Sequence, residues 1–452
     1  MRSLSRKLLV LVTLVGILLL AGHLIRGVVL DRIANRSSAQ ESIAASLAES
    51  QTLAGPVLMV RYAERFTRPV FDDKGKLIRK EDLLERGEKL FLPEALKLSG
   101  TLHNETRYRG VFRINTYLLG GSLQSTLRMP TAEDLSHSHP DSRIEIEGAQ
   151  LIIALSDPRG IRQLRISQGG EPLRIEAGTG LKTPATGVNA ALPNFAALLG
   201  KTLNIRADLQ IAGTDSFAML PLGRETTVGL RSDWPHPSFG GRFLPVNRKV
   251  GDKGFEAEWQ INGVASLARQ AWETDAGRTL KAEPFSVSLI DPVDIYSMSD
   301  RASKYSELFI LLTLGAFLLF EMLRRLRLHP LNYLLVGAAL LIFFLLLLSL
   351  SEQIGFGPAY LAAGSACVLL IGFYSAQLLR SAWLAGGFTV GLGVLYSAIY
   401  VILLSEQNAL LMGSLLLFAL LACVMIGTRK VDWHKQLASN TDVASASVPG
   451  EQ

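Results

Sequence analysis

The chain has 452 residues, a net charge of +6 and an apolar content of 48%, and its longest apolar segments lie near the two ends. Its two cysteines, Cys367 and Cys423, both lie in such segments. The central part contains no cysteine, so disulfide bonds, thiol chemistry and zinc-thiolate chemistry are excluded there. Because many of the basic residues outside that part flank apolar segments, the charge is a signal of membrane topology and does not indicate nucleic-acid binding.

The first predicted element is a transmembrane helix over residues 8–30, preceded by a short basic terminus at 1–7. No small-residue cleavage site closes the apolar segment, which favours an uncleaved helix over a signal peptide. Apolar residues continue at helical spacing, so we expect a stalk helix within 31–55, reaching about Ser50 and stopped by Gly55–Pro56.

The pattern changes over residues 56–292. Short alternating apolar runs, such as 142–155 and 202–213, are separated by Gly, Pro, Asn and Asp. Alternation with a period of two predicts strands, and we expect a large all-β domain of sandwich or barrel type. The charged residues 72–89 are interpreted as a solvated loop or a surface helix, and residues 293–305 as a linker.

The C-terminal third carries five further apolar segments, which makes six predicted spans. The segments cover about 306–323, 331–350, 356–379, 384–404 and 409–427, followed by a tail over 428–452 with a disordered end. Lys and Arg occur before the first span and after the second, fourth and sixth. Since such residues stay in the cytoplasm, both termini are predicted inside and the β domain outside, in the periplasm of a bacterial cell. The predicted fold class is an α-helical six-span membrane bundle plus a large all-β periplasmic domain.

Two features of the predicted spans are candidate functional elements. The outer turns carry Glu352 and Glu406 in matching SEQ triplets, which indicates either a duplicated two-helix hairpin or two helix ends that both favour polar residues at the membrane interface. Gly387 and Gly391 form a GxxxG pattern, which lets helix backbones approach closely. We expect them to pack inside the bundle, with dimerisation as the alternative.

The stretch DWPHPSFGGRF, residues 233–243, contains the residue types of a hydrolytic triad in Asp233, His236 and Ser238. Its two prolines keep the chain extended, so these side chains are not expected to converge. We interpret the stretch as a stiff aromatic corner that either closes the β core or is offered to a partner. The candidate residues of this corner are Trp234, His236, Phe239 and Phe243.

No other motif indicates a catalytic, metal or cofactor site. His137 and His139 stand two residues apart in a polar segment, where a solvated loop is favoured over a metal site. The AGTGLKT stretch, 177–183, departs from phosphate-loop spacing and is interpreted as a glycine turn. We therefore predict no catalytic residue, no metal ligand and no cofactor.

Several motifs in combination and order resemble those of the CreD family of inner membrane proteins, which are linked with cell-envelope integrity. They are LAGP (53–56), YRGVF (108–112), SDPRGI (156–161), SDWPHPSFGGRFLP (232–245), the PVD-x-Y-x₄-R-x₂-KY stretch (292–305), FLLFE (317–321), LHPLNYLLVG (328–337), LLLLSLSEQIGF (345–356) and TRKVDW (428–433). The resemblance covers nearly the whole chain. It implies the topology given above and a role in envelope stress under the CreBC two-component system, and it supplies no catalytic residues.

Three functions stay open. The favoured one is a non-enzymatic envelope protein, held in the lipid bilayer, whose β domain binds a periplasmic protein or glycan. The second is an outer-leaflet enzyme in which His103, Glu105 and His236 converge. The third is a lipid or small-molecule transporter, against which the lack of ionisable residues near the middle of the spans counts. No nucleic-acid partner is expected, and the oligomeric state is left open.

Overall fold

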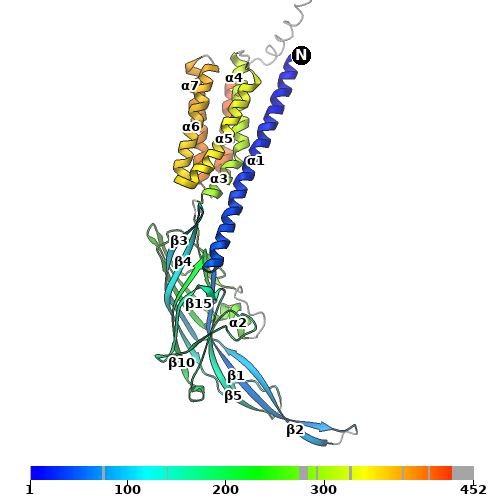
Figure 1. The fold of residues 1–452 in the computed structure, drawn as a ribbon, viewed down its shortest axis with the longest axis vertical. Helices are drawn as coiled ribbons and strands as arrows, with labels where there is room; N and C mark the ends of the chain where they lie inside the picture. The colour runs from blue at the N-terminus through cyan, green and yellow to red at the C-terminus, as the bar shows by residue number, and fades with distance from the viewer. Residues whose placement is uncertain are drawn as a thin grey trace, which may run out of the picture. The chain divides into compact units, whose positions relative to one another are not determined.

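The computed structural model of the chain describes residues 2–73, 77–139, 141–273, 283–291, 294–324, 328–378, 381–405 and 408–429. It divides into two compact units, one over Ser37–Pro292 and the other over Met1–Arg36 together with Val293–Gln452. The first consists mainly of strands and the second of helices, and we call them the β unit and the helical unit (Figure 1).

The N-terminal helix α1 (Arg2–Ser46) is continuous from the helical unit into the β unit. The stalk predicted within 31–55 is thus helical only to Ser46. Beyond that point the backbone of Glu49 bonds to β-unit residues, so the helical hydrogen bonds are not continued. Gly55–Pro56, expected to stop the helix, lies inside the first strand.

Eight strands form each of two sheets. The first sheet contains β1 (Gln51–Phe71), β2 (Leu77–Phe91), β5 (Arg143–Leu155), β8 (Ile175–Ala177), β9 (Gly187–Ala191), β11 (Ser216–Met219), β13 (Pro237–Gly241) and β16 (Phe285–Leu289). The second contains β3 (Ala95–Arg109), β4 (Phe112–Arg128), β6 (Ile161–Gln168), β7 (Glu171–Pro172), β10 (Thr202–Thr214), β12 (Glu225–Ser232), β14 (Asn247–Gly251) and β15 (Gly254–Asn262). Their orders are β13–β16–β11–β1–β5–β9–β8, with β2 paired to β1, and β14–β15–β12–β3–β4–β10–β6–β7.

The main core of the β unit contains side chains from both sheets. Leu96 and Leu98 of β3 alternate with exposed residues, and they belong to one buried cluster with Leu58 and Val60 of β1. Alternation places every second side chain on the same face of a strand, so this cluster is the packed interior of a β sandwich. The β part of the predicted fold class is therefore present.

The first sheet is also covered on its other face. Met59 of β1 and Ile152 of β5 belong to a second buried cluster with Trp272 of the short helix α2 (Leu267–Glu273). Burial on both faces explains why residues 53–60 form a nearly continuous apolar run. Gly55 sits here at a φ of +105°, and the register of β1 on β5 shifts between Ala54 and Val57. Such irregularities are where a sheet tolerates proline.

The charged residues 72–89 were predicted as a loop or surface helix, and within the described residues this is wrong. Most of them lie in β2, which runs antiparallel to β1 from Phe71↔Leu77 to Leu58↔Phe91. Opposite charges face each other at two positions of this hairpin, Arg61↔Glu88 and Arg68↔Glu81. Cross-strand pairs of this kind stabilise a strand whose own sequence has little apolar alternation.

In the described residues, the helical unit contains the N-terminal part of α1 and six further helices. These are α3 (Ile295–Lys304), α4 (Ser306–Arg324), α5 (Pro330–Ile354), α6 (Phe356–Leu378), α7 (Ala382–Leu404) and α8 (Ala409–Thr428). The linker predicted over 293–305 is thus mostly helical. Asp294 caps α3 by accepting the Ser297 N–H at 3.0 Å, and Arg301 and Lys304 suit its C-terminal end.

The prediction of six spans is wrong. In the described residues four helices are long and apolar enough to cross a membrane, namely α1, α5, α6 and α7. A fifth results only if α3 and α4, bent by 41° at Tyr305, are counted as one span, and the described apolar part of α8 is limited to Leu411–Ala422. A straight span needs about 20 apolar residues, and the described apolar parts of α4 and α8, Ser306–Leu319 and Leu411–Ala422, are shorter than that.

Candidate functional site at the end of the first helix

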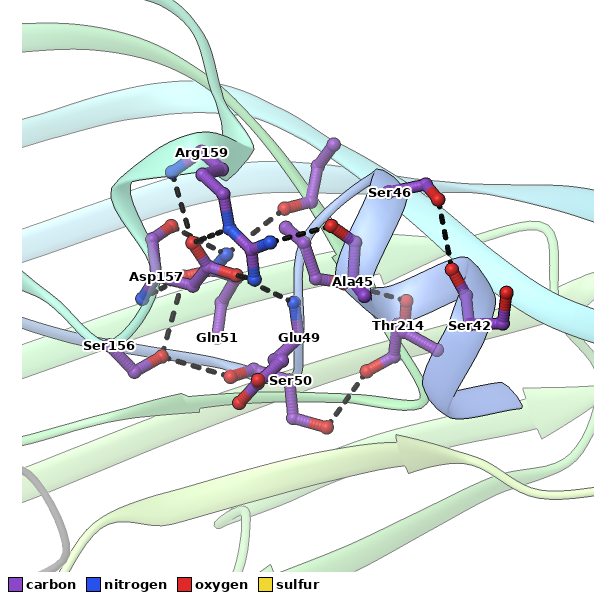
Figure 2. A network of polar contacts seen from close by, with 12 residues as sticks. Ser42, Ala45, Ser46, Glu49, Ser50, Gln51, Ser156, Asp157, Arg159 and Thr214 are labelled. Carbon is purple, nitrogen blue, oxygen red and sulfur yellow. Dashed lines mark hydrogen bonds and ion pairs between the residues drawn. The ribbon is translucent and has the colours of Figure 1, made fainter. Parts of the chain in front are cut away.

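The SDPRGI motif folds around a buried carboxylate. Asp157 follows β5, is 6% exposed and caps a single 3₁₀ turn at Pro158–Gly160. Its oxygens accept hydrogen bonds from the Glu49 N–H at 3.0 Å and from the Arg159 guanidinium at 2.7 and 2.9 Å (Figure 2). The motif therefore turns its own arginine back onto its aspartate.

This pairing keeps both groups charged. Burial of Asp157 opposes its ionisation, but the hydrogen bonds from Arg159 and from the Glu49 N–H outweigh it, so the pKa of the carboxyl lies below its usual value. The hydrogen bonding of its side chain to Asp157 raises the pKa of Arg159. The pair is thus a permanent feature at physiological pH.

The pair also holds the last turn of α1. Arg159 Nη1 donates to the Ala45 carbonyl at 2.6 Å, and Thr214 at the end of β10 donates its hydroxyl to the Ala48 carbonyl at 2.8 Å. The Ser50 hydroxyl returns a bond to the Thr214 carbonyl at 2.8 Å. A helix leaves its last carbonyls without partners inside the helix, and the β unit supplies partners for them.

Gln51 and Ser156 complete this set of contacts, which we call the junction (residues 45–52, 156–160 and 214). Gln51 Nε2 donates to the Asp157 carbonyl at 2.9 Å, and the Ser156 hydroxyl donates to the Ser50 carbonyl at 2.9 Å. Gly160 is required because a Cβ there would clash with the Ala212 carbonyl oxygen. The polar atoms of these three segments bond to one another, so the junction holds the segments together as a clamp.

An open groove of about 510 Å³ lies beside the junction. Its lining residues are Ser42, Ile43 and Ser46 of α1, Leu47 directly after it, Thr106, Arg107, Tyr108 and Arg109 of β3, and Arg162 of β6. Three of these nine residues are arginines, and Tyr108 is 69% exposed. In the sequence the groove left no signal beyond the YRGVF motif, because its residues come from three separate elements.

The charges of the groove are only partly balanced. Arg107 Nη2 contacts Glu105 Oε2 at 3.1 Å. Within the described part of the chain, Arg109 and Arg162 have no ion pair or side-chain hydrogen bond. The groove therefore presents two uncompensated guanidinium groups, beside an exposed phenol ring.

The aromatic corner of residues 233–243 belongs to the core of the β unit. Trp234 is 8% exposed, and its indole N–H donates to the carbonyls of His236 at 3.1 Å and Ile290 at 3.0 Å. Phe239 packs edge to face on Phe255, with ring centroids 5.6 Å apart. Phe243 lies partly buried against the same core, whereas the His236 ring is exposed.

The candidate catalytic residues are not joined to one another. Asp233 accepts the Asn104 N–H at 3.0 Å, and Glu105 binds Arg107. In the residues that the structure describes, no hydrogen bond links the side chains of His103, Glu105 and His236, and no group of three or more His, Cys, Asp or Glu side chains is placed to hold a metal ion.

His137 and His139 lie in a loop organised by Glu64, a residue that the sequence did not single out. The buried Glu64 carboxylate accepts the Ser142 hydroxyl at 2.5 Å and the His139 N–H at 3.0 Å. The Ser142 bond prevails over desolvation and lowers the pKa of Glu64 to about 2. His137 Nδ1 lies 2.7 Å from Ser142 Oγ. This cluster anchors the loop.

Glu352, predicted at an outer turn, is paired within the helical unit. Its Oε1 lies 3.7 Å from Arg32 Nε of α1 and accepts the Tyr296 hydroxyl of α3 at 3.3 Å. Arg36 pairs with Asp294 at 3.1 Å in the same way. Glu406, the other predicted outer-turn residue, lies outside the described residues.

Gly387 and Gly391 do not contact another described helix. A Cβ at either position would meet no atom within 4 Å. The contact between α6 and α7 is made elsewhere, since Gly372 of α6 leaves no room for a Cβ beside Thr389 of α7. The packing expected for the GxxxG pattern is thus not made inside the described bundle.

Together these features define a membrane-helix protein whose β sandwich is clamped to the end of its first helix. Comparison with known proteins identifies its family. The model of the CreD family, described as inner membrane protein CreD, matches residues 3–434. Inner membrane protein CreD of Escherichia coli (strain K12) is 33% identical over 420 residues, which cover 92% of this chain and 91% of that protein. The chain therefore belongs to the CreD family of inner membrane proteins.

Solved structures give weaker similarities. An M1 zinc metallopeptidase from Deinococcus radiodurans aligns with a TM-score of 0.23 and 12% identity, over 45% of this chain and 43% of that one. A two-domain M1 zinc metallopeptidase bound to L-tryptophan aligns with a TM-score of 0.19 and 11% identity, over 44% and 42%. The chain thus spans less than half of the solved structures it matches.

Proposed function

We propose that the chain is a multi-pass inner membrane protein that contributes to cell-envelope integrity by presenting its β unit to an envelope partner, without catalysis. Both termini would lie in the cytoplasm and the β unit in the periplasm, as the distribution of Lys and Arg indicates. The observation that carries the proposal is the junction. It clamps the β unit to the end of α1, whose preceding part is apolar enough to cross a membrane.

Deletion of the β unit tests the role. A variant lacking residues 57–290 should be inserted in the membrane but should fail to restore envelope-stress survival to a strain without the protein. A matched variant with Asp157→Ala should be impaired in part, because it weakens the clamp and keeps the β unit. Full restoration by the deletion variant would refute the proposal.

Cysteine labelling tests the orientation. Val264 of the β unit is 86% exposed, so a Val264→Cys variant should react with a membrane-impermeant maleimide in intact spheroplasts. The unsubstituted chain provides the background from Cys367 and Cys423. Labelling that appears only after lysis would place the β unit in the cytoplasm.

A further inference from the structure

The groove beside α1 contains three arginines that two strands bring together. Arg107 and Arg109 flank Tyr108 at the end of β3, and all three residues line the groove. Arg162 comes from β6, which lies three strands away in the same sheet, beyond β4 and β10. Arg162 is more than fifty positions from Arg107 and Arg109 in the chain, so the convergence of the three residues is a property of the fold.

The groove combines these charges with a ring and two hydroxyl groups. Tyr108 is exposed, and it faces Arg113 in the register of β3 on β4. On the opposite wall, α1 contributes Ser42 and Ser46. Two arginines of the groove are unpaired within the described residues, as shown above, and Arg107 is shared with Glu105.

The end of a helix carries a partial negative charge, which would repel an anion. Here hydrogen bonds satisfy part of that charge. The Ala45 carbonyl accepts Arg159, the Ser42 carbonyl accepts the Ser46 hydroxyl at 2.9 Å, and the Ile43 carbonyl accepts the Leu47 N–H at 2.8 Å. These bonds reduce the repulsion of an anion in the groove.

Guanidinium groups bind phosphate through paired N–H donors, and the energy gain is largest where several converge. A volume of about 510 Å³ is in the range of small-ligand sites. We propose that the groove binds a phosphate-bearing anion through Arg109 and Arg162, with Arg107 and Tyr108 at its edge. The inference rests on the proposed function, since it gives the chemistry of the envelope partner. Because the chain is an inner membrane protein, phospholipid headgroups are the most abundant source of this chemistry around it.

The test uses the purified full-length chain in a neutral maltoside detergent and isothermal titration calorimetry. The probes are inorganic pyrophosphate, short-chain phosphatidylglycerol, and short-chain diacylglycerol, which has no phosphate. The variants are Arg109→Gln/Arg162→Gln, the charge-retaining Arg109→Lys/Arg162→Lys, and a control, Arg165→Gln/Arg248→Gln. The control removes the same charge from exposed positions outside the groove.

We expect the unsubstituted chain and the control to bind phosphatidylglycerol saturably. The Gln variant should bind at least about tenfold more weakly and the Lys variant by an intermediate amount, because Lys keeps the charge and loses the paired donors. Binding of pyrophosphate as well identifies phosphate itself as the determinant; binding of the lipid alone identifies a headgroup site.

Absence of saturable binding of both phosphate probes, equal binding by the Gln variant, or equal binding of diacylglycerol would overturn the inference. Equal unfolding temperatures of the Gln variant and the control show that the comparison is between folded proteins. The measurement depends on neither orientation nor phenotype. Its failure would leave the proposed function with a different partner, whereas rescue by the chain without its β unit would refute the function regardless of phosphate binding.

Discussion

The dipeptide Ser-Asp occurs at two corners of the β unit, and the comparison shows how differently one pair of residues is used. At both corners the serine hydroxyl donates to the carbonyl of a neighbouring segment, Ser156 to Ser50 at 2.9 Å and Ser232 to Leu102 at 2.7 Å. The aspartates differ. Asp157 is buried and holds a guanidinium, whereas Asp233 is exposed and accepts one backbone N–H.

The difference arises from the residues that follow. After Asp157 the sequence Pro-Arg-Gly makes a tight turn that returns Arg159 to the carboxylate. After Asp233 the sequence Trp-Pro sends an indole into the core, where its N–H bonds to two carbonyls. The stabilising group is therefore the carboxylate at the first corner and the indole at the second.

Removal of the indole should have the largest effect on stability. We expect Trp234→Ala to lower the free energy of unfolding of the β unit by about 3–5 kcal/mol, because it leaves a cavity in the core. Trp234→Phe should cost about 1–3 kcal/mol, since it removes mainly the N–H donor. Hydrogen exchange of β13 and β16 in the full chain measures this loss, with Leu244→Ala, at an exposed position nearby, as control. Unchanged exchange in Trp234→Ala would show that the corner is not part of the core.

Loss of the carboxylate should come next. Asp157→Ala leaves the Glu49 N–H and the Nε and Nη2 groups of Arg159 without an acceptor, which we expect to cost about 1–3 kcal/mol. Faster exchange should be confined to the junction and is read out at residues 45–52, because the core contacts between the sheets are untouched. If exchange accelerates equally in β13, the two corners form one cooperative element and the contrast between them disappears.

Much of the fold follows from local pattern, and the junction does not. Period-two alternation predicts the strands, and the paired prolines predict that Asp233, His236 and Ser238 stay apart. The charged strand β2 is missed because its partners lie on β1, across a hairpin. Asp157 and Glu49 are over a hundred residues apart, so only the folded chain shows that they meet.

The wrong prediction of two spans and the failure to predict the groove have the same physical origin. Apolar content predicts helices at 306–323 and 409–427, but the 41° bend at Tyr305 is not visible in composition. The groove needs Arg109 and Arg162 to meet beside α1, and neither position has a local pattern that marks it. Sites built from several elements require the tertiary structure.

Acidification should destabilise the corner at Asp157 before the corner at Trp234, and we expect this effect to be moderate. Because the pKa of Asp157 is lowered by folding, its ionised form stabilises the junction above the pKa of the unfolded chain, about 3.9. That contribution is lost as the pH falls below this value. The indole N–H of Trp234 does not titrate. We therefore expect the protection of residues 45–52 against exchange, relative to the intrinsic rate at each pH, to fall below about pH 4 before the protection of β13 does. Asp157→Asn should abolish this step; an unaltered acid response in that variant would assign it to another group.

The smallest effect is expected from Asp233→Asn. The side chain is exposed and accepts a single bond from the Asn104 N–H, and the amide oxygen of asparagine can accept the same bond. A surface substitution of this kind changes stability by about 0.5 kcal/mol or less. Asp157→Asn is the matched change, but there one of the two buried oxygens becomes an NH₂ group facing the Arg159 donors, so the cost should be several times larger. Unfolding temperatures of the two variants in one detergent decide the point. Equal shifts would mean that burial of Asp157 and its additional donors contribute nothing beyond the single hydrogen bond that the two corners share.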